Sequence, residues 1–154
     1  VVMTRTSSKI YGLGGLRLGW MYGPAGIVDV IGRLRQPFNV NLAAQAAGIA
    51  ALEDIAHTDA GRTNNDIWLP WLGAELAKLG LAPLPSVGNF VLVGFGSPER
   101  AAAANAWMAN DGLIPRMVAA YGLPEYVRIT VGTAAENDKV VAALTDFMQA
   151  GQAR

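Results

Sequence analysis

The chain has 154 residues, which is enough for an ordinary domain with a full hydrophobic core. Hydrophobic residues make up 52% of it and charged residues 16%, a composition too apolar for a disordered chain. Twelve basic side chains balance twelve acidic ones, so no net field favours nucleic acid or an anionic membrane.

Cysteine is absent, which excludes disulfides and thiolate metal sites and fits a reducing cytoplasm. The single histidine argues against a His-rich metal site and against a Ser-His-Asp triad, so we expect no metal. No apolar run is long enough to span a membrane, and no signal-peptide pattern opens the sequence. The first residues have the pattern of a strand already in progress, so we interpret the chain as part of a longer protein.

The beginning of the chain is predicted to form two strands and a helix. Residues 1–6 have the pattern of a short buried strand and residues 18–22 that of a second, with a polar, glycine-rich loop between them. Pro24 can open a helix, because apolar residues then recur at helical spacing up to Arg35.

Two further helices are predicted in the middle of the chain. Asn41 is a plausible N-cap for an alanine-rich helix that runs to about Ala56. Residues 62–79 form the next predicted helix, in which Pro70 must cause a kink or mark the real start. Gly80 ends this helix.

The last part of the chain alternates strands and helices. Ser97 and the following proline indicate a helix that ends near Gly112, and Thr133 with Glu136 forms a capping box for a final helix. The predicted strands are residues 89–95, 113–116 and 126–131. This order predicts an α/β piece, a long helix and a compact α+β unit from about residue 80.

The loop between the first two strands contains the residues that indicate chemistry. A reactive lysine must be partly neutral near pH 7, which requires desolvation or a nearby positive charge. Lys9 follows a hydrophobic strand and lies among small residues. Thr6 and Ser8 offer hydroxyl donors, and Arg17 offers a planar fork for phosphate. Together these groups suit an aldehyde cofactor that bears a phosphate.

Other interpretations of this loop must be weighed. A dinucleotide-binding fingerprint would need glycine at position 17, where the chain has arginine. The phosphate loop of nucleotide-hydrolysing enzymes needs a Gly-Lys-Ser/Thr step, which is absent. A Ser-Lys hydrolase dyad is possible in composition, although nothing else supplies an acyl-transfer site. The residues alone also leave open a flexible glycine loop with one exposed lysine.

Residues 6–19 read Thr-x-Ser-Lys-x-Tyr-Gly-Leu-x-Gly-Leu-Arg-Leu-Gly, which resembles the lysine segment of fold-type I pyridoxal-phosphate (PLP) enzymes in the aspartate aminotransferase superfamily. Within that superfamily the pattern is most similar to the histidinol-phosphate aminotransferase family. Later segments resemble the same family in the same order, at residues 33–41, 89–91, 121–124 and 127–133. The resemblance implies an α/β fold with three parts: the end of the PLP-binding large domain (residues 1–60), an interdomain helix (61–79) and a small α+β C-terminal domain (80–154).

The resemblance also implies roles for individual residues. Lys9 would form the Schiff base with PLP and then act as general base in the proton shift between C4′ and the substrate Cα. Arg128 would receive the substrate carboxylate or, in histidinol phosphate, the phosphate, and Arg116 would be a second substrate-binding arginine. The cofactor phosphate would be held by Thr6, Ser8 and Arg17. Without the resemblance, Arg128 and Arg116 would be interpreted as members of surface or structural ion pairs.

The implied reaction is PLP-dependent transamination of histidinol phosphate and 2-oxoglutarate to imidazole acetol phosphate and glutamate, a step of histidine biosynthesis, by a cytoplasmic homodimer. In the family, the acidic partner of the pyridine nitrogen lies upstream of the lysine, so we expect these 154 residues alone to be inactive or nearly so. Aromatic amino acid aminotransferase and threonine-phosphate decarboxylase share the lysine loop and are alternatives. An alternative of another class is a non-catalytic aminotransferase-like domain for ligand sensing or dimerisation.

Overall fold

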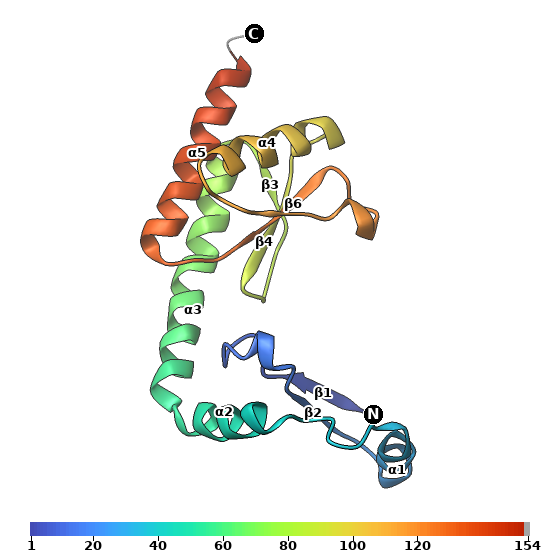
Figure 1. Ribbon diagram of the computed structural model, residues 1–154. Helices are drawn as coiled ribbons and strands as arrows, with labels where there is room; N and C mark the ends of the chain where they lie inside the picture. Colours follow the sequence, from blue (N-terminus) through green and yellow to red (C-terminus); the bar gives the residue numbers. More distant parts are fainter. Residues whose placement is uncertain (153–154) are drawn as a thin grey trace. The chain divides into compact units, whose positions relative to one another are not determined.

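The computed structural model describes residues 1–152 and divides the chain into two compact units between Arg62 and Thr63 (Figure 1). Helix α3, Ile55–Lys78, is continuous across this division. The boundary therefore falls inside the helix predicted at residues 61–79. No helix of the described part of the chain has both the length and the apolar character needed to cross a membrane.

The first unit begins with a two-stranded antiparallel sheet made of β1, Met3–Thr6, and β2, Gly19–Tyr22. Glycine is required at position 19, because a Cβ there would lie 2.7 Å from the backbone oxygen of Arg5. Both predicted strands are confirmed. The prediction that residues 1–6 are buried is wrong, because every residue of β1 is exposed and β2 is its only strand partner within residues 1–152.

Two helices follow in the first unit. The helix α1, Ala25–Leu34, begins directly after Pro24, as predicted. The helix α2, Leu42–Glu53, begins after Asn41, whose side-chain oxygen accepts a hydrogen bond of 2.8 Å from the Ala44 N–H. The predicted N-cap is thus confirmed, although α2 ends three residues earlier than expected.

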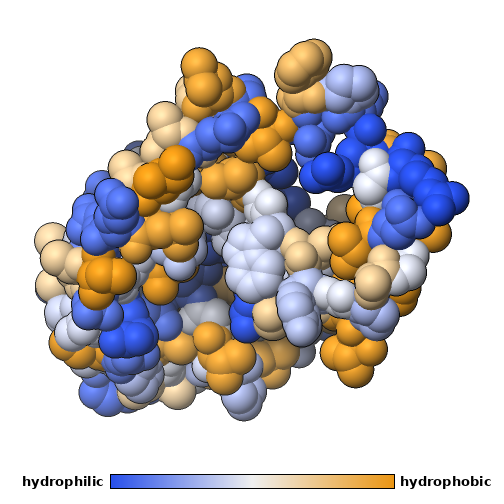
Figure 2. Space-filling view, turned by 90° about the horizontal axis from the view of Figure 1, so that it is seen from below, coloured by the Kyte–Doolittle hydropathy of each residue, from blue (hydrophilic) through white to orange (hydrophobic). Residues whose placement is uncertain are grey.

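The apolar side chains of α1 remain at the surface. The helix has the predicted spacing of apolar residues, yet none of its residues is buried within the described part of the chain. Leu34, for example, is 78% exposed. The space-filling view shows hydrophobic side chains interspersed with hydrophilic ones across the face it presents (Figure 2).

The helix α3 starts at Ile55 rather than at residue 62. The Asp54 carboxylate accepts a 3.0 Å hydrogen bond from the His57 N–H, which satisfies a donor of the first turn. Pro70 therefore lies inside the helix, and the prediction that it could mark the start is wrong. A proline inside a helix costs about 3 kcal/mol, and the complete burial of Leu72 and Leu76 just after it offsets this cost.

Gly80 ends α3, as predicted. Its φ of +76° is a left-handed conformation that glycine adopts without strain. The Gly80 N–H bonds to the Ala77 oxygen at 2.9 Å and the Leu81 N–H to the Leu76 oxygen at 3.3 Å. These two bonds form the Schellman arrangement that satisfies the last carbonyls of a helix.

The second unit contains a four-stranded antiparallel sheet in the order β3-β4-β6-β5. Its strands are β3, Ala82–Pro83; β4, Phe90–Gly94; β5, Arg116–Met117; and β6, Tyr126–Thr130. The strands predicted at residues 89–95 and 126–131 are confirmed. The one predicted at 113–116 is placed too early, because residue 113 still belongs to the turn that ends the preceding helix: the Leu113 N–H bonds to the Met108 oxygen at 3.0 Å.

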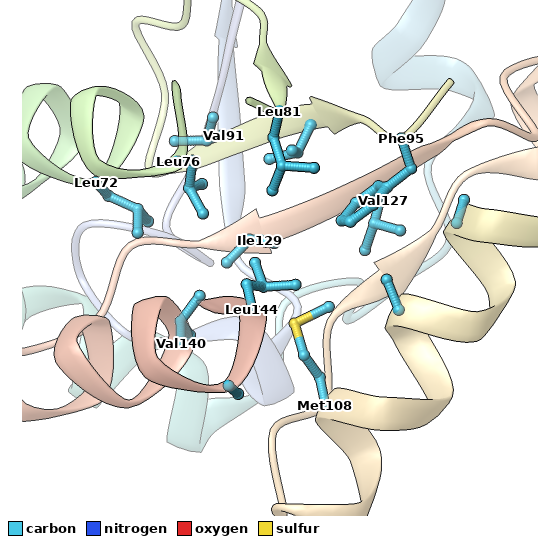
Figure 3. Packing of buried hydrophobic residues seen from close by; sticks show 14 residues of the cluster. Leu72, Leu76, Leu81, Val91, Phe95, Met108, Val127, Ile129, Val140 and Leu144 are labelled. Atoms are coloured by element: carbon cyan, nitrogen blue, oxygen red, sulfur yellow. The ribbon is translucent and has the colours of Figure 1, made fainter. Parts of the chain in front are cut away.

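The helices α4, Pro98–Asn110, and α5, Ala134–Gln152, complete the second unit. The Ser97 hydroxyl accepts a 3.2 Å bond from the Arg100 N–H, which confirms the predicted cap. Side chains from three helices and one face of the sheet form the core (Figure 3), including Leu72, Leu76, Met108, Val127, Ile129 and Leu144. Successive strand residues point to opposite faces, so Arg128, between Val127 and Ile129, lies on the sheet face opposite the core.

The start of α5 provides a test of the capping prediction. Glu136 Oε2 accepts hydrogen bonds of 2.8 Å from the Thr133 N–H and from the Thr133 hydroxyl. The backbone bond first, and the hydroxyl second, hold the pKa of Glu136 below its usual value of 4.5. Glu136 therefore contributes stability that is present above pH 4.5 and is lost as the pH falls through its lower folded pKa.

We therefore expect Glu136→Gln to have a lower Tm than the natural sequence at pH 7, because glutamine keeps an acceptor but loses the charge. The difference in Tm between the two proteins should shrink steadily as the pH falls below 4.5. Thermal denaturation at a series of pH values would measure it. The control is Glu53→Gln at the end of α2, where a carboxylate is unfavourable and its removal should not lower the Tm. A Tm difference at Glu136 that does not change with pH would contradict this account.

Candidate functional site

The predicted cofactor-binding hydroxyls lie together where β1 ends. The Thr6 hydroxyl donates to Ser8 Oγ at 2.9 Å, and the Ser8 N–H donates to Thr6 Oγ1 at 3.1 Å. Thr6 is the last residue of its strand, so the regular pairing of β1 with β2 holds its backbone in place. The structure thus brings two of the three predicted phosphate ligands into contact.

The loop between β1 and β2 is closed at its base. The buried Ser7 donates its N–H to the Leu18 oxygen at 3.0 Å, and its own oxygen accepts from the Leu13 N–H at 3.0 Å. The closing bond joins Ser7 and Leu18. Ser8 comes directly after Ser7, and Arg17 comes directly before Leu18, so both lie at the base of the loop. The third predicted phosphate ligand therefore belongs to the same end of the loop as the hydroxyl pair.

Arg17 is held in an unusual conformation. Its φ of +58° is left-handed, which costs a residue with a Cβ about 1–2 kcal/mol. The guanidinium donates to the Gly14 oxygen at 2.7 Å, and a Cβ on Gly14 would lie 3.5 Å from the Ser8 oxygen. Gly14 thus lies beside both the Arg17 guanidinium and the Ser8 backbone. A guanidinium has five N–H groups, so others remain for an anion.

Lys9 lies at the start of a tight turn in this loop. The Gly12 N–H bonds to the Lys9 oxygen at 2.9 Å, and Gly12 has a φ of +68°. The lysine side chain is exposed, and within residues 1–152 its amine forms no ion pair or side-chain hydrogen bond. No described side chain therefore holds the Lys9 amine in place.

The helix α2 packs against the loop between β1 and β2. The Asn41 amide donates to the Leu16 oxygen at 3.4 Å, in addition to capping α2 through its oxygen. A Cβ on the buried Gly48 would lie 2.5 Å from Leu18 Cδ2, so α2 packs closely against the base of the loop. Sequence reasoning identified Asn41 only as a helix cap. Its contact with a residue 25 positions away has no local signal in the sequence.

The two predicted substrate arginines lie in the second unit and face each other. Arg116 of β5 is directly opposite Arg128 of β6 in the strand register. Met117 pairs with the core residue Val127, so both arginines occupy the other face of the sheet. The structure therefore brings the two arginines together, although twelve positions separate them in the sequence.

Aromatic rings and not carboxylates accompany both arginines. The Arg128 guanidinium carbon lies 5.2 Å from the centre of the Phe90 ring, and the buried Arg128 Nε has no hydrogen-bond partner among residues 1–152. Arg116 donates to the Tyr121 hydroxyl at 2.9 Å and lies 5.7 Å from that ring. Neither arginine forms an ion pair with any described residue. Two unneutralised cations on one face suit an anionic ligand.

Sequence reasoning did not identify Phe90 or Tyr121 as part of this arrangement. Phe90 reaches Arg128 only because the register of β4 with β6 places it opposite Thr130, diagonal to the arginine. Tyr121 lies only five residues after Arg116, but no sequence pattern indicates that its hydroxyl turns back toward the strand. Local spacing could not have found either contact.

Comparison with known proteins identifies relatives of nearly the whole chain. The family model for aminotransferase class I and II matches residues 1–144. Histidinol-phosphate aminotransferase of Granulibacter bethesdensis is 54% identical over 147 residues, which covers 96% of this chain and 40% of that protein. The corresponding enzyme of Paramagnetospirillum magneticum is 49% identical over 152 residues, which covers 97% of this chain and 42% of that protein.

A solved structure agrees with these sequence matches. The crystal structure of histidinol-phosphate aminotransferase from Sinorhizobium meliloti, in complex with pyridoxal-5′-phosphate, matches with a TM-score of 0.86 and 34% sequence identity. The match covers 97% of this chain and 41% of that chain. The chain therefore spans about 40% of the length of these relatives.

Proposed function

The chain belongs to the aminotransferase class I and II family, and from this membership we propose that it is part of a PLP-dependent aminotransferase. The proposed reaction moves an amino group from histidinol phosphate to 2-oxoglutarate, which yields imidazole acetol phosphate and glutamate in histidine biosynthesis. The observation that carries the proposal is the closed loop after β1, in which Lys9 directly follows Ser8 of the hydrogen-bonded Thr6–Ser8 pair. The 54% identity to a histidinol-phosphate aminotransferase supports the choice of substrate.

The residues of the loop fit PLP by their chemistry. Two adjacent hydroxyls and a guanidinium are donors of the kind that a phosphate group accepts, so Thr6, Ser8 and Arg17 would hold the cofactor phosphate. Lys9 would bind the cofactor covalently through Nζ. When bound, PLP supplies an electron sink that makes the substrate Cα–H acidic. The amine of Lys9 would take up the proton from that Cα and deliver it to C4′ of the cofactor.

The two arginines would form the site for the anionic ends of the substrates. Arg128 would receive the phosphate of histidinol phosphate and the carboxylate of glutamate, and Arg116 would add a second guanidinium on the same sheet face. Planar guanidinium forks match both anions. The absence of a neutralising carboxylate within residues 1–152 supports this role, because an acid paired with either arginine would compete with the substrate.

The organisation of the whole enzyme is also a proposal. Residues 1–60 would be the C-terminal part of the PLP-binding large domain, residues 61–79 the interdomain helix and residues 80–154 the small domain. The exposed apolar side chains of α1 support this division, because further polypeptide of a large domain would cover them. We propose that the complete protein acts as a cytoplasmic homodimer and that the 154 residues alone are inactive.

The test is a substrate comparison on the full-length protein loaded with PLP. Transamination of histidinol phosphate with 2-oxoglutarate, followed as glutamate formation, should show a kcat/KM at least about 10²-fold above that for phenylalanine, because the phosphate offers both arginines close to two negative charges and phenylalanine offers a single carboxylate. A preference for phenylalanine would instead identify an aromatic amino acid aminotransferase. Release of CO₂ from threonine phosphate would identify a decarboxylase, and failure to bind PLP would identify a non-catalytic domain.

A further inference from the structure

Arg116 and Arg128 bring two positive charges close together on the sheet face opposite the core of the second unit. Arg116 and Arg128 are direct cross-strand partners, and Cβ atoms of such pairs lie about 4.5–5.5 Å apart. Like charges opposite each other repel, and no carboxylate of the described residues pairs with either one. Something other than an ion pair must therefore keep each guanidinium in place.

Packing fixes Arg128. Its side chain is half-buried, its Nε is enclosed, and its guanidinium lies over the Phe90 ring at 5.2 Å. Arg116 differs, because it is exposed on a two-residue edge strand. Its one side-chain hydrogen bond within residues 1–152 goes to the Tyr121 hydroxyl, and its guanidinium carbon lies 5.7 Å from that ring. Tyr121 is thus the residue that orients Arg116.

The backbone holds Tyr121 firmly, although its side chain is exposed. It ends the short helix η2, Ala119–Tyr121, in which its N–H bonds to the Val118 oxygen at 2.9 Å. Gly122 follows with a φ of +79° and bonds to the Ala119 oxygen at 2.9 Å. Val118, just before this turn, is buried and anchors it to the rest of the unit. The turn therefore fixes the backbone position from which the Tyr121 side chain reaches Arg116.

We propose that Tyr121 is a positioning residue that orients Arg116 so that both arginines can bind one phosphate group together. The inference rests on the proposed function, because it concerns how the same anion site selects its substrate. A phosphate monoester presents three acceptor oxygens and close to two negative charges, which two guanidiniums can share. A single carboxylate has two oxygens and one charge, which the fork of Arg128 alone can satisfy. Tyr121 therefore favours the phosphate-bearing substrate over glutamate.

The two half-reactions of an aminotransferase allow this selectivity to be measured separately. Each substrate reacts in its own half of a ping-pong cycle, so kcat/KM for histidinol phosphate and for glutamate are independent quantities. In the full-length protein, Tyr121→Phe removes the hydroxyl and keeps the ring. It should lower kcat/KM for histidinol phosphate about tenfold, the effect of losing one hydrogen bond to a charged group. The value for glutamate should change less than about twofold, since Arg128 keeps its packing.

Two controls separate positioning from a structural effect. Tyr126→Phe changes a tyrosine on the same sheet face, two residues before Arg128, and should alter neither half-reaction. Tyr121→Phe should also have no further effect in an Arg116→Met background, because the hydroxyl would then have no guanidinium to orient. The binding of inorganic phosphate can be measured by calorimetry without turnover. Tyr121→Phe should weaken the affinity for phosphate about tenfold, because one hydrogen bond to a charged group is lost.

The outcomes are distinct. An unchanged phosphate affinity and an unchanged histidinol-phosphate half-reaction in Tyr121→Phe would overturn the inference. An equal loss in both half-reactions, or a full additional loss in the Arg116→Met background, would also overturn it, because either result indicates a structural role. If the natural protein does not react with histidinol phosphate at all, the proposed function fails, and the phosphate-binding measurement still decides the role of Tyr121.

Discussion

Replacement of Lys9 by alanine is expected to abolish transamination by the full-length protein. A positioned acid–base group contributes about 10²–10⁴-fold to a rate, and Lys9 would also bind the cofactor covalently, so kcat should fall by at least about 10²-fold. Lys9→Arg should be equally inactive, because a guanidinium keeps the charge but cannot lose its proton near pH 7. Single-turnover rates with histidinol phosphate would measure both variants.

The control for Lys9 is Lys78→Ala. Lys78 lies at the end of α3, is exposed, and pairs with Glu75 at the surface, where an ion pair contributes little. Borohydride reduction of the PLP-loaded protein, followed by peptide mapping, should label Lys9 and leave Lys78 and Lys139 unlabelled. A label on another lysine, or near-normal turnover in Lys9→Ala, would exclude the assigned role.

Replacement of Arg128 by lysine is the second change with a large expected effect. Lysine keeps the charge but lacks the planar fork and stacks less well on Phe90. Loss of one partner of a desolvated charge contact costs about 2–5 kcal/mol, so kcat/KM should fall about 10²-fold. Because Arg128 would bind both the phosphate and the carboxylate, both half-reactions should fall, unlike the selective effect expected at Tyr121.

The matched control for Arg128 is Arg62→Lys on α3. Arg62 pairs with Asp59 at the surface and is 67% exposed, so the exchange should leave both half-reactions unchanged. Thermal denaturation of each variant would identify any loss of folding. If Arg128→Lys keeps both values of kcat/KM within about threefold, far below the loss expected for a desolvated contact, Arg128 does not bind the substrate anion.

Most helix ends could be predicted from the sequence, because a cap is a contact within a few residues. Asn41 and Ser97 each accept from the N–H three residues on, and Gly80 ends α3 with a φ that favours glycine. The start of α3 differs from the predicted one because the alanine-rich helix, expected to run to about Ala56, includes Asp54, which in the structure caps the next helix. For Pro70 the sequence leaves a kink or a helix start open, and only the second is wrong: the burial of Leu72 and Leu76 outweighs the local cost of a proline inside the helix.

The short strand β5 shows the limit of local patterns. It consists of two residues and exists because β6 lies beside it, so its position follows from the partner strand and not from its own sequence. The buried strand expected at residues 1–6 was misjudged for a related reason. An apolar run indicates a strand, but burial depends on which other elements cover it.

The lysine loop could be recognised as a candidate site without the fold, because Thr6, Ser8, Lys9 and Arg17 lie within twelve consecutive residues and the chemistry of each is visible in its side chain. The tertiary structure alone decided how the two arginines are arranged. Their pairing follows from the register of β5 with β6, and their aromatic neighbours come from β4 and from the turn after β5. Such contacts join residues that are distant in sequence, so no local spacing contains them.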